Sequence, residues 1–387
     1  MIFKPCMTPK NMEHPMHWEN DRVVGQLPSV FGAFSPEEMQ DPEKQAVQRK
    51  VLLEQSVELC FGGIPPKPEV FHVTHLYAGT YRITAGTKEK TVSFSLTLFR
   101  PKGDGKHPVL LTGDQCAWYC NDEIMKLFRD KGYIVAQFNR AELAIDNLNE
   151  FQDNSEGVYP VSPDMRFGMI AAWAWGYHRA VDALLTMEDV DPDCICITGH
   201  SRGGKATLLA AATDERIAFT QASGSGCFGA GCFRYSQYED DQRDIPNHHC
   251  EKLENMVGVD VPWNILHWIG PEMKEYVGRE QELPFDMHFL KAAIAPRFFL
   301  ETGGVDDVWA NPRGSYQTFR AAREMYTAMG IPERIASVYR EGGHGHLRED
   351  FESFLKFIEA GRAGKPFYRS NADSIFGELP IIYDWGM

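Results

Sequence analysis

The chain has 387 residues and a formal net charge of −15 at pH 7, because 39 Lys and Arg face 54 Asp and Glu. Hydrophobic residues make up 43% and aromatic residues 12%, which is typical of a folded globular protein with a sizeable core. The acidic balance argues against nucleic acids and anionic membranes, since both are bound by basic surfaces. We therefore expect neither as a partner.

The N-terminal sequence and the cysteines bear on the compartment. The stretch MIFKPCMTPKNMEHP lacks an apolar core of signal-peptide length, and no later stretch approaches about 18 uninterrupted apolar residues. The nine cysteines form no regular framework, and a chain of this length needs no disulfides, so we interpret them as reduced thiols. These features predict a cytoplasmic protein.

The first part of the chain differs from the rest. Residues 1 to about 35 are rich in Pro, Met and polar residues and predict an extended arm. Residues 36–60 have Ser35 as a candidate N-cap, acidic residues in the first turn and apolar positions at near-helical spacing. We expect residues 1–69 to form this arm and a helix that packs on the core.

From residue 70 onward, strand and helix patterns alternate. A strand with period-two apolar residues is expected at 92–99. Further strands are expected at 108–112, 133–138, 194–198, 217–222, 297–302 and 336–341, and helices at 121–130, 167–188, 202–213, 313–329 and 349–360. This order predicts an α/β fold with a mostly parallel central sheet and helices on both faces, a three-layer sandwich. Residues 70–387 are expected to form one catalytic domain, with an insertion around 226–284 that shapes a binding site.

The segment CICITGHSRGGKATLLAAA runs from a predicted strand through a G-x-S-x-G turn into a predicted helix. Gly199 and Gly203 leave room for a tight turn that projects the Ser201 hydroxyl at the carboxyl end of the strand. The helix that begins at Arg202 points free N–H groups at the same place, which suits a developing oxyanion. An inert serine in an ordinary glycine-rich turn is the alternative. The coincidence of motif and context favours a nucleophile.

A serine nucleophile needs a base, and the base needs a carboxylate to orient it. Asp306 and Asp307 follow the predicted strand at 297–302, and His344 and His346 follow the one at 336–341. This is the order nucleophile, acid, histidine of the α/β-hydrolase fold, which we therefore expect. Taken alone, Asp307 could be a helix cap and His344 a loop histidine. A second oxyanion donor is expected in the loop 113–118, from the amide of Gln115 or Cys116.

Histidines and cysteines elsewhere raise the possibility of a metal. His248, His249 and Cys250 are adjacent, but their spacing matches none of the usual zinc patterns. We expect neither a metal nor a cofactor.

Several stretches of the chain resemble the glucuronoyl esterases of carbohydrate esterase family fifteen and their bacterial relatives, within the α/β-hydrolase superfamily. The matching stretches are RKVLLEQSVELCFGGIPPKP, WAWGYHRAVDAL, VDPDCICITGHSRGGKATLLAAATDERIA, SGSGCFGAGCFR, LPFDMHFLKAAIAPR, DVWANPRG and GGHGHLREDF. They span most of the chain after residue 49. Together they are considerably more specific than G-x-S-x-G alone.

The resemblance implies a role for five residues. Ser201 matches the nucleophile, His344 the base, Arg202 an arginine that stabilises the oxyanion, Lys205 a lysine that contacts sugar hydroxyls and Trp309 a tryptophan beside the uronate. Lys205 follows Ser201 by one helical turn and so shares its face of the helix; a solvated lysine is the alternative.

The chain also departs from the family pattern. Many members carry the triad acid as a Glu at the position of Ala222. Asp307, which fits D-x-W-A, would then be the acid, as in some bacterial relatives, with Asp306 as the fallback.

These observations predict a serine carboxylic-ester hydrolase that works through an acyl-enzyme, without cofactor. The resemblance implies a small-molecule or oligosaccharide substrate, an ester of a uronic acid such as a methyl or aryl-alkyl glucuronate. One alternative is a general acyl or acetyl (xylan) esterase, or a dienelactone-hydrolase-like enzyme, with the same triad but no uronate selectivity. Another is a non-catalytic α/β-hydrolase that binds sugars, against which the complete triad argues.

Overall fold

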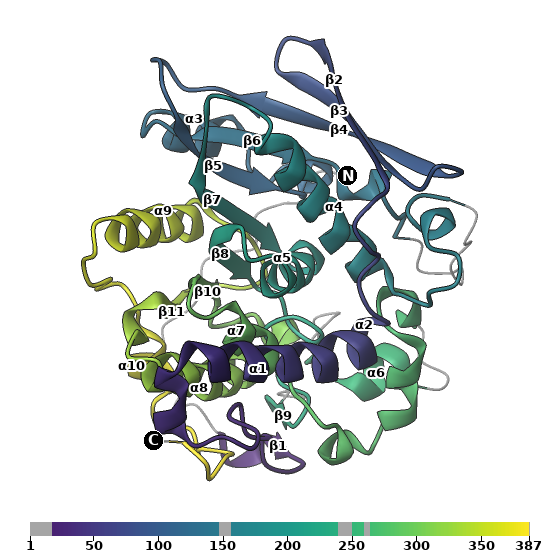
Figure 1. Cartoon of the computed structure of the whole chain (residues 1–387). Helices are drawn as coiled ribbons and strands as arrows, with labels where there is room; N and C mark the ends of the chain where they lie inside the picture. The colour runs from purple at the N-terminus through teal and green to yellow at the C-terminus, as the bar shows by residue number, and fades with distance from the viewer. Residues whose placement is uncertain (1–17, 147–155, 239–249, 259–263, 387) are drawn as a thin grey trace.

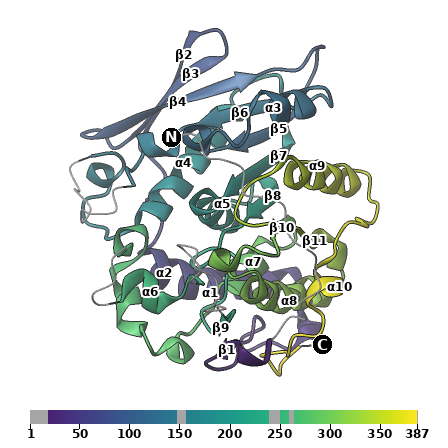
Figure 2. The ribbon, with the colours of Figure 1, turned by 180° about the vertical axis from the view of Figure 1, so that it is seen from behind.

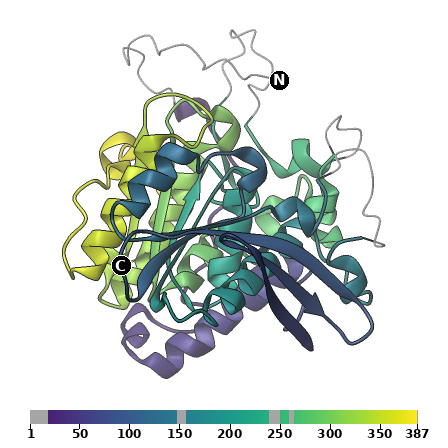
Figure 3. The same cartoon turned by 90° about the horizontal axis from the view of Figure 1, so that it is seen from above.

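A twisted nine-stranded sheet forms the centre of the computed structural model, which describes residues 18–146, 156–238, 250–258 and 264–386 (Figure 1). The strand order is β11, β10, β8, β7, β5, β6, β4, β3, β2. The strands span β2 Val70–Tyr77, β3 Thr80–Gly86, β4 Thr91–Phe99, β5 His107–Thr112, β6 Ile134–Phe138, β7 Val190–His200, β8 Ile217–Ser223, β10 Phe298–Gly304 and β11 Ile335–Arg340. The six strands from β11 to β6 pair in parallel, while β4, β3 and β2 form an antiparallel edge. Figure 3, seen from above, shows this edge in dark blue in front of the parallel strands.

Helices cover both faces of the sheet, as the alternating pattern predicts. They span α1 Pro42–Leu53, α2 Leu59–Phe61, α3 Asp122–Arg129, α4 Met169–Leu184, α5 Arg202–Thr213, α6 Leu253–Val257, α7 His288–Ile294, α8 Pro312–Ala328, α9 Arg348–Arg362 and α10 Ala372–Phe376. One core packs α3 and α9 against the sheet, and a larger core packs α4, α5, α7 and α8 against its other face (Figure 2). The side chains of Leu110 and Leu111, which are neighbours on β5, enter different cores, as the alternation of a strand requires. The predicted fold class is confirmed.

The predicted elements of the hydrolase core correspond closely to observed ones. Each predicted strand has a counterpart in the sheet, and the five predicted helices correspond to α3, α4, α5, α8 and α9. Helix α7 lies within a stretch for which no element was predicted. Its seven residues are all buried, so it lacks the polar face that marks an amphipathic helix in a sequence.

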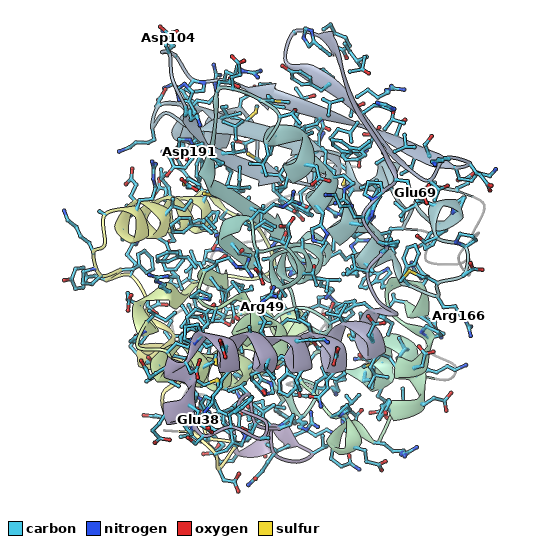
Figure 4. The ribbon with its side chains drawn as sticks, in the orientation of Figure 1. Glu38, Arg49, Glu69, Asp104, Arg166 and Asp191 are labelled. Atoms are coloured by element: carbon cyan, nitrogen blue, oxygen red, sulfur yellow. The ribbon has the colours of Figure 1, made fainter. Side chains whose placement is uncertain are left out.

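The helix expected at 36–60 is divided into shorter pieces. A 3₁₀ turn at Pro36–Gln40 precedes α1, and a π-helical turn at Glu54–Glu58 separates α1 from α2. Asp41 caps α1 by accepting from the amide of Glu43 at 2.9 Å. Arg49 of α1 donates to the carbonyls of Ala212 and Ala293, at the ends of α5 and α7, and so ties α1 to the core (Figure 4). Residues 1–17 of the predicted arm lie outside the described residues.

The predicted insertion around 226–284 joins β8 to the segment that precedes α7. Its described part contains α6 and the short strand β9 Tyr235–Ser236, which pairs with β1 Arg22–Val23 near the start of the chain. The aromatic residues of this segment are mostly packing residues: Phe228, Phe233, Tyr235 and Trp268 are buried, Tyr238 is exposed, and Trp263 lies outside the described residues. The division into residues 1–69 and 70–387 with an insertion stays our interpretation of the chain.

Within the described ranges, no helix is both long enough and apolar enough to cross a lipid bilayer.

Candidate active site

Ser201 lies between β7 and α5 in a strained backbone conformation, with φ +53° and ψ −120°. A non-glycine residue adopts such a positive φ only where its surroundings enforce it. Both motif glycines are required by close contacts. A Cβ at Gly199 would lie 2.4 Å from Thr207 Oγ1, and one at Gly203 would lie 2.0 Å from Asp114 Oδ1. The turn predicted from G-x-S-x-G is therefore present, and Asp114 is one reason for its second glycine.

The turn formed by residues 199–203, the nucleophile elbow, presents polar groups at the carboxyl end of β7. The Ser201 amide donates to Ser223 O at 2.9 Å, which anchors the turn to β8. Arg202 begins α5, so its amide belongs to the first turn, where helix N–H groups lack helical acceptors.

Asp307 and His344 meet at the ends of β10 and β11. His344 Nδ1 lies 2.8 Å from Asp307 Oδ2, and Asp307 is only 3% exposed. Asp306 instead accepts from the amide of Gly342 at 3.1 Å and is exposed. Of the two predicted acids, only Asp307 contacts the histidine.

The pKa of His344 is raised above its ordinary value. Burial acts to lower this pKa, but the hydrogen bond and the negative charge of Asp307 outweigh burial. Glu251 also acts to raise it and Lys205 to lower it, which places both side chains close enough to influence the ring electrostatically. The Nδ1 contact with a carboxylate leaves Nε2 available to act as a base.

Two further histidines pack behind His344. The ring of His200 lies 4.5 Å from that of His344 and 5.6 Å from that of His346, between centroids. Tyr119 contacts the rings of His200 and His346, and Phe351 stacks on His346 at 3.9 Å. Burial lowers the pKa of His346 to about 3 and that of His200 well below its usual range, so both are neutral. The three rings do not form a metal site: among the residues described, no group of three or more His, Cys, Asp or Glu could hold an ion.

Arg202 is held at the edge of the elbow. Its guanidinium pairs with Asp146 and lies 5.7 Å from the ring centroid of Trp268. Burial raises the pKa of the Cys116 thiol, while the charge of Arg202 acts in the opposite direction, so Arg202 lies near the loop after β5. The oxyanion role of Arg202 stays a prediction.

Lys205 lies differently from what was expected. Its ammonium is buried and donates to Ser225 O at 2.6 Å, Cys227 O at 2.7 Å and Glu251 Oε2 at 2.9 Å. Three acceptors satisfy the three N–H groups of a lysine, so this ammonium has no donor left for a sugar hydroxyl. Lys205 instead fixes the turn after β8 and Glu251. The expected contact of Lys205 with sugar hydroxyls stays a prediction.

Trp309 is half-buried. It lies next to Glu251, since the Trp309 carbonyl accepts from the Glu251 amide at 2.9 Å. This places Trp309, two residues after Asp307, beside the pair formed by Lys205 and Glu251. Its expected place next to a uronate stays a prediction.

Sequence reasoning missed four residues of the site: Asp114, Arg140, Asp146 and Glu251. Asp114 and Arg140 follow β5 and β6 by two residues each, so their position at the carboxyl ends of parallel strands is a usable signal. Asp146 and Glu251 lie in irregular segments without periodicity, where no comparable signal exists.

The chain is similar to known esterases over most of its length. The family model described as glucuronyl esterase of fungi matches residues 83–330, well over half of the chain. A 4-O-methyl-glucuronoyl methylesterase from Wolfiporia cocos is 29% identical over 295 residues, which cover 74% of this chain and 67% of that protein.

Solved structures agree with this likeness. A carbohydrate esterase family 15 glucuronoyl esterase from Caldicellulosiruptor kristjansonii has a TM-score of 0.75 and 27% identity, and the match covers 91% of this chain and 96% of that one. A glucuronoyl esterase mutant from Sporotrichum thermophile, in complex with methyl 4-O-methyl-β-D-glucopyranuronate, has a TM-score of 0.70 and 22% identity, with 90% and 91% covered. At that identity the second structure supports the fold alone.

Proposed function

The chain belongs to the glucuronoyl esterase family and is a carboxylic ester hydrolase, and on that premise we propose that it cleaves uronic acid esters with Ser201, His344 and Asp307 as its triad. The observation that carries this proposal is the 2.8 Å contact between His344 and Asp307 beside the strained Ser201 turn. All three residues follow parallel strands at the same edge of the sheet, in the order that the fold uses.

The reaction would proceed in two steps. Ser201 Oγ attacks the ester carbonyl while His344 Nε2 takes its proton, and His344 then passes this proton to the leaving alcohol. Water, activated by the same imidazole, attacks the acyl-enzyme and releases the uronic acid. Asp307 holds the Nδ1 proton and stabilises the imidazolium in both steps. The hydrogen bond from Ser201 to His344 is expected to close when substrate binds, as is common in hydrolases.

The tetrahedral intermediate carries a negative charge that needs donors. The Arg202 amide at the start of α5 and the amide of Gln115 or Cys116 are suited to this role by their place at the elbow and in the loop after β5. The Arg202 guanidinium adds a positive charge at the edge of the same region.

The acyl half of the ester is assigned to the side of β8 and β10. Names of relatives refer to glucuronoyl methylesterases, and a neighbouring structure holds a methyl glucuronate ester. Glu251 and Trp309 lie together on this side, beside the triad, and Lys205 holds Glu251 in place. A carboxylate and an indole offer a sugar ring an acceptor for its hydroxyls and a flat face for stacking.

The alcohol half is assigned to the loops that follow β5, β6 and β11, each of which carries an exposed apolar residue. Trp118, Ile145 and Leu347 are 71%, 64% and 47% exposed. Each is adjacent in sequence to a residue that contacts the elbow or its histidine: Tyr119, Asp146 and His346. An apolar rim of this kind fits an aryl-alkyl alcohol better than methanol, because apolar burial contributes about 25 cal/mol per Å².

A substrate panel tests this function. We expect methyl glucuronate and benzyl glucuronate to be hydrolysed with a kcat/KM well above that for p-nitrophenyl acetate, and benzyl glucuronate to be the better of the two. Acetylated xylose serves as the control for a general acetyl esterase. Comparable or faster cleavage of the acetyl esters would contradict the uronate assignment and favour the general esterase.

The compartment is a separate proposal. We propose that the protein works in a reducing, cytoplasmic environment, where its cysteines remain thiols. All eight described cysteines are free, and Cys116 is exposed. Cell fractionation with an antibody tests it, and recovery of the protein from the medium would overturn it.

A further inference from the structure

Asp114 and Arg140 form a buried ion pair beside the nucleophile turn. They follow the neighbouring parallel strands β5 and β6, and they are 2% and 6% exposed. The backbone also joins the two segments, because the Arg140 amide donates to Gly113 O at 3.1 Å. The guanidinium lies 4.6 Å from the ring centroid of Trp173, which covers it from the side of α4. The pair is therefore fixed from three directions.

The Asp114 carboxylate contacts the nucleophile turn before and after Ser201. Its Oδ2 accepts from the His200 amide at 2.8 Å. Its Oδ1 lies so close to Gly203 that a Cβ there would be at 2.0 Å. The strained Ser201 lies between these two contacts in sequence, so the carboxylate restrains the turn on both sides of the nucleophile.

Asp114 also begins the loop that carries the second candidate oxyanion donor. The Ala117 amide donates to Asp114 O at 2.9 Å, which closes a short turn over Gln115 and Cys116. Through its backbone Asp114 thus belongs to the loop that carries one candidate oxyanion amide, and through its carboxylate it contacts the turn that carries the other. No other described residue makes both connections.

A buried carboxylate next to an oxyanion hole creates an electrostatic problem. Uncompensated, its negative charge would oppose the charge that develops on the substrate oxygen. Arg140 lies against this carboxylate. Burial lowers the pKa of Arg140 to about 10, so its guanidinium stays protonated at neutral pH.

We propose that Asp114 and Arg140 are positioning residues for the oxyanion hole: Asp114 sets the spacing of its two amides, and Arg140 neutralises the carboxylate that does so. This inference rests on the proposed serine esterase function and deepens it. In this inference the pair affects the rate of acylation, whereas an ion pair with only a structural role would affect stability alone.

The two halves of the pair are then unequal. Asp114→Asn keeps an oxygen that accepts from the His200 amide and removes the negative charge, so we expect kcat to stay within about threefold of wild type. Arg140→Met leaves the carboxylate unneutralised, and we expect kcat to fall roughly 10- to 100-fold with KM changed less than about threefold. The double variant Asp114→Asn with Arg140→Met removes both charges and should recover most of the loss. Asp114→Ala with Arg140→Met lacks the acceptor and should not recover.

The buried pair of Arg234 and Asp286 provides a matched control far along the chain from the turn. Arg234→Met should lower the melting temperature without changing kcat per active site. Rates are measured on p-nitrophenyl acetate and divided by the fraction of sites that react with a fluorophosphonate, which counts correctly folded enzyme and does not depend on uronate selectivity. A wild type that hydrolyses no ester would instead refute the proposed function.

Equal losses in Asp114→Asn and Arg140→Met would overturn the inference, as would a double variant no faster than Arg140→Met. If Arg140→Met does not fold, the comparison of Asp114→Asn with Asp114→Ala decides. The inference requires the alanine variant to be at least about tenfold slower in kcat, and equal rates would refute it.

Discussion

The two sides of Ser201 differ in the kinds of side chain that surround the nucleophile. On the side of β8 and β10, charged groups are buried and paired: Lys205 with Glu251, and His344 with Asp307. On the side of β5 and β6, the ion pair of Asp114 and Arg140 is buried, and the described surface carries large exposed apolar side chains, Trp118 and Ile145. An ester also has two unlike halves. On the proposed function, the contrast assigns the acid of the ester to the polar side and its alcohol to the apolar side of Ser201.

The largest expected effect comes from the polar side. Asp307→Asn should lower kcat on the order of 10⁴-fold, because the imidazole loses the carboxylate that sets its tautomer and stabilises its charge. The base must be neutral to act, so kcat/KM rises with pH through the raised pKa of His344. Without Asp307 only burial remains among the main causes, and the acid limb should move to lower pH. Asp306→Asn is the control and should lose at most a few-fold; the reverse ranking would reassign the acid.

The second effect compares two buried lysine–glutamate pairs. Lys205 pairs with Glu251 at the site, and Lys291 pairs with Glu301 in the core. Lys291→Met should destabilise the fold by about 3 kcal/mol or more without changing kcat per active site. Lys205→Met should lower kcat/KM on methyl glucuronate roughly 10- to 100-fold.

The pH profile separates these two lysines further. Lys205 acts to lower the pKa of His344, so its loss should shift the acid limb of kcat/KM to higher pH. Lys291→Met should leave the acid limb in place. An unshifted limb in Lys205→Met, with activity retained, would mean that this pair belongs to the scaffold alone.

A third effect concerns His346, where the two sides meet. This histidine is neutral in the fold, so its contribution to stability is complete above the unfolded pKa near 6.5 and is lost as pH falls toward its folded pKa of about 3. His346→Phe keeps a flat ring against Phe351 and removes the titration. Between pH 7 and pH 5, the free energy of unfolding of wild type should fall by about 2 kcal/mol relative to that of the variant, as measured by urea denaturation. An equal pH dependence of the two proteins would contradict the assignment.

The smallest effect is expected on the apolar side. Trp118→Ala should lower kcat/KM for benzyl glucuronate about 3- to 10-fold, with little change for methyl glucuronate, because only the larger alcohol reaches the indole. Tyr368→Ala removes an aromatic residue that is 88% exposed elsewhere and should change neither rate. Equal losses on both esters would remove Trp118 from the alcohol side.

The site residues on the two sides also differ in how well they could be predicted from the sequence. Ser201, Asp307 and His344 follow strands whose apolar runs are unmistakable, so chain order and strand ends were enough to bring them together. Asp114 and Arg140 occupy equivalent positions, but a single Asp or Arg after a strand has many ordinary explanations. Their significance depends on a contact between two loops, which no local pattern records.

Lys205 illustrates a different limit. Its position one turn after Ser201 correctly placed it on the same face of α5, yet it was expected to face substrate and is instead buried on three acceptors. The partner Glu251 comes from the insertion, 46 residues along the chain. Long-range partners of this kind decide whether a lysine is free or satisfied, and helical periodicity contains no information about them.

The most direct test of the central claim is the identity of the residue that becomes acylated. Wild-type protein is treated with a fluorophosphonate, the adduct is located by peptide mass spectrometry, and Ser201→Ala is assayed beside it on methyl glucuronate. We predict one adduct, on Ser201, with loss of both labelling and hydrolysis in the alanine variant. An adduct on another residue, or full hydrolysis by Ser201→Ala, would contradict the account.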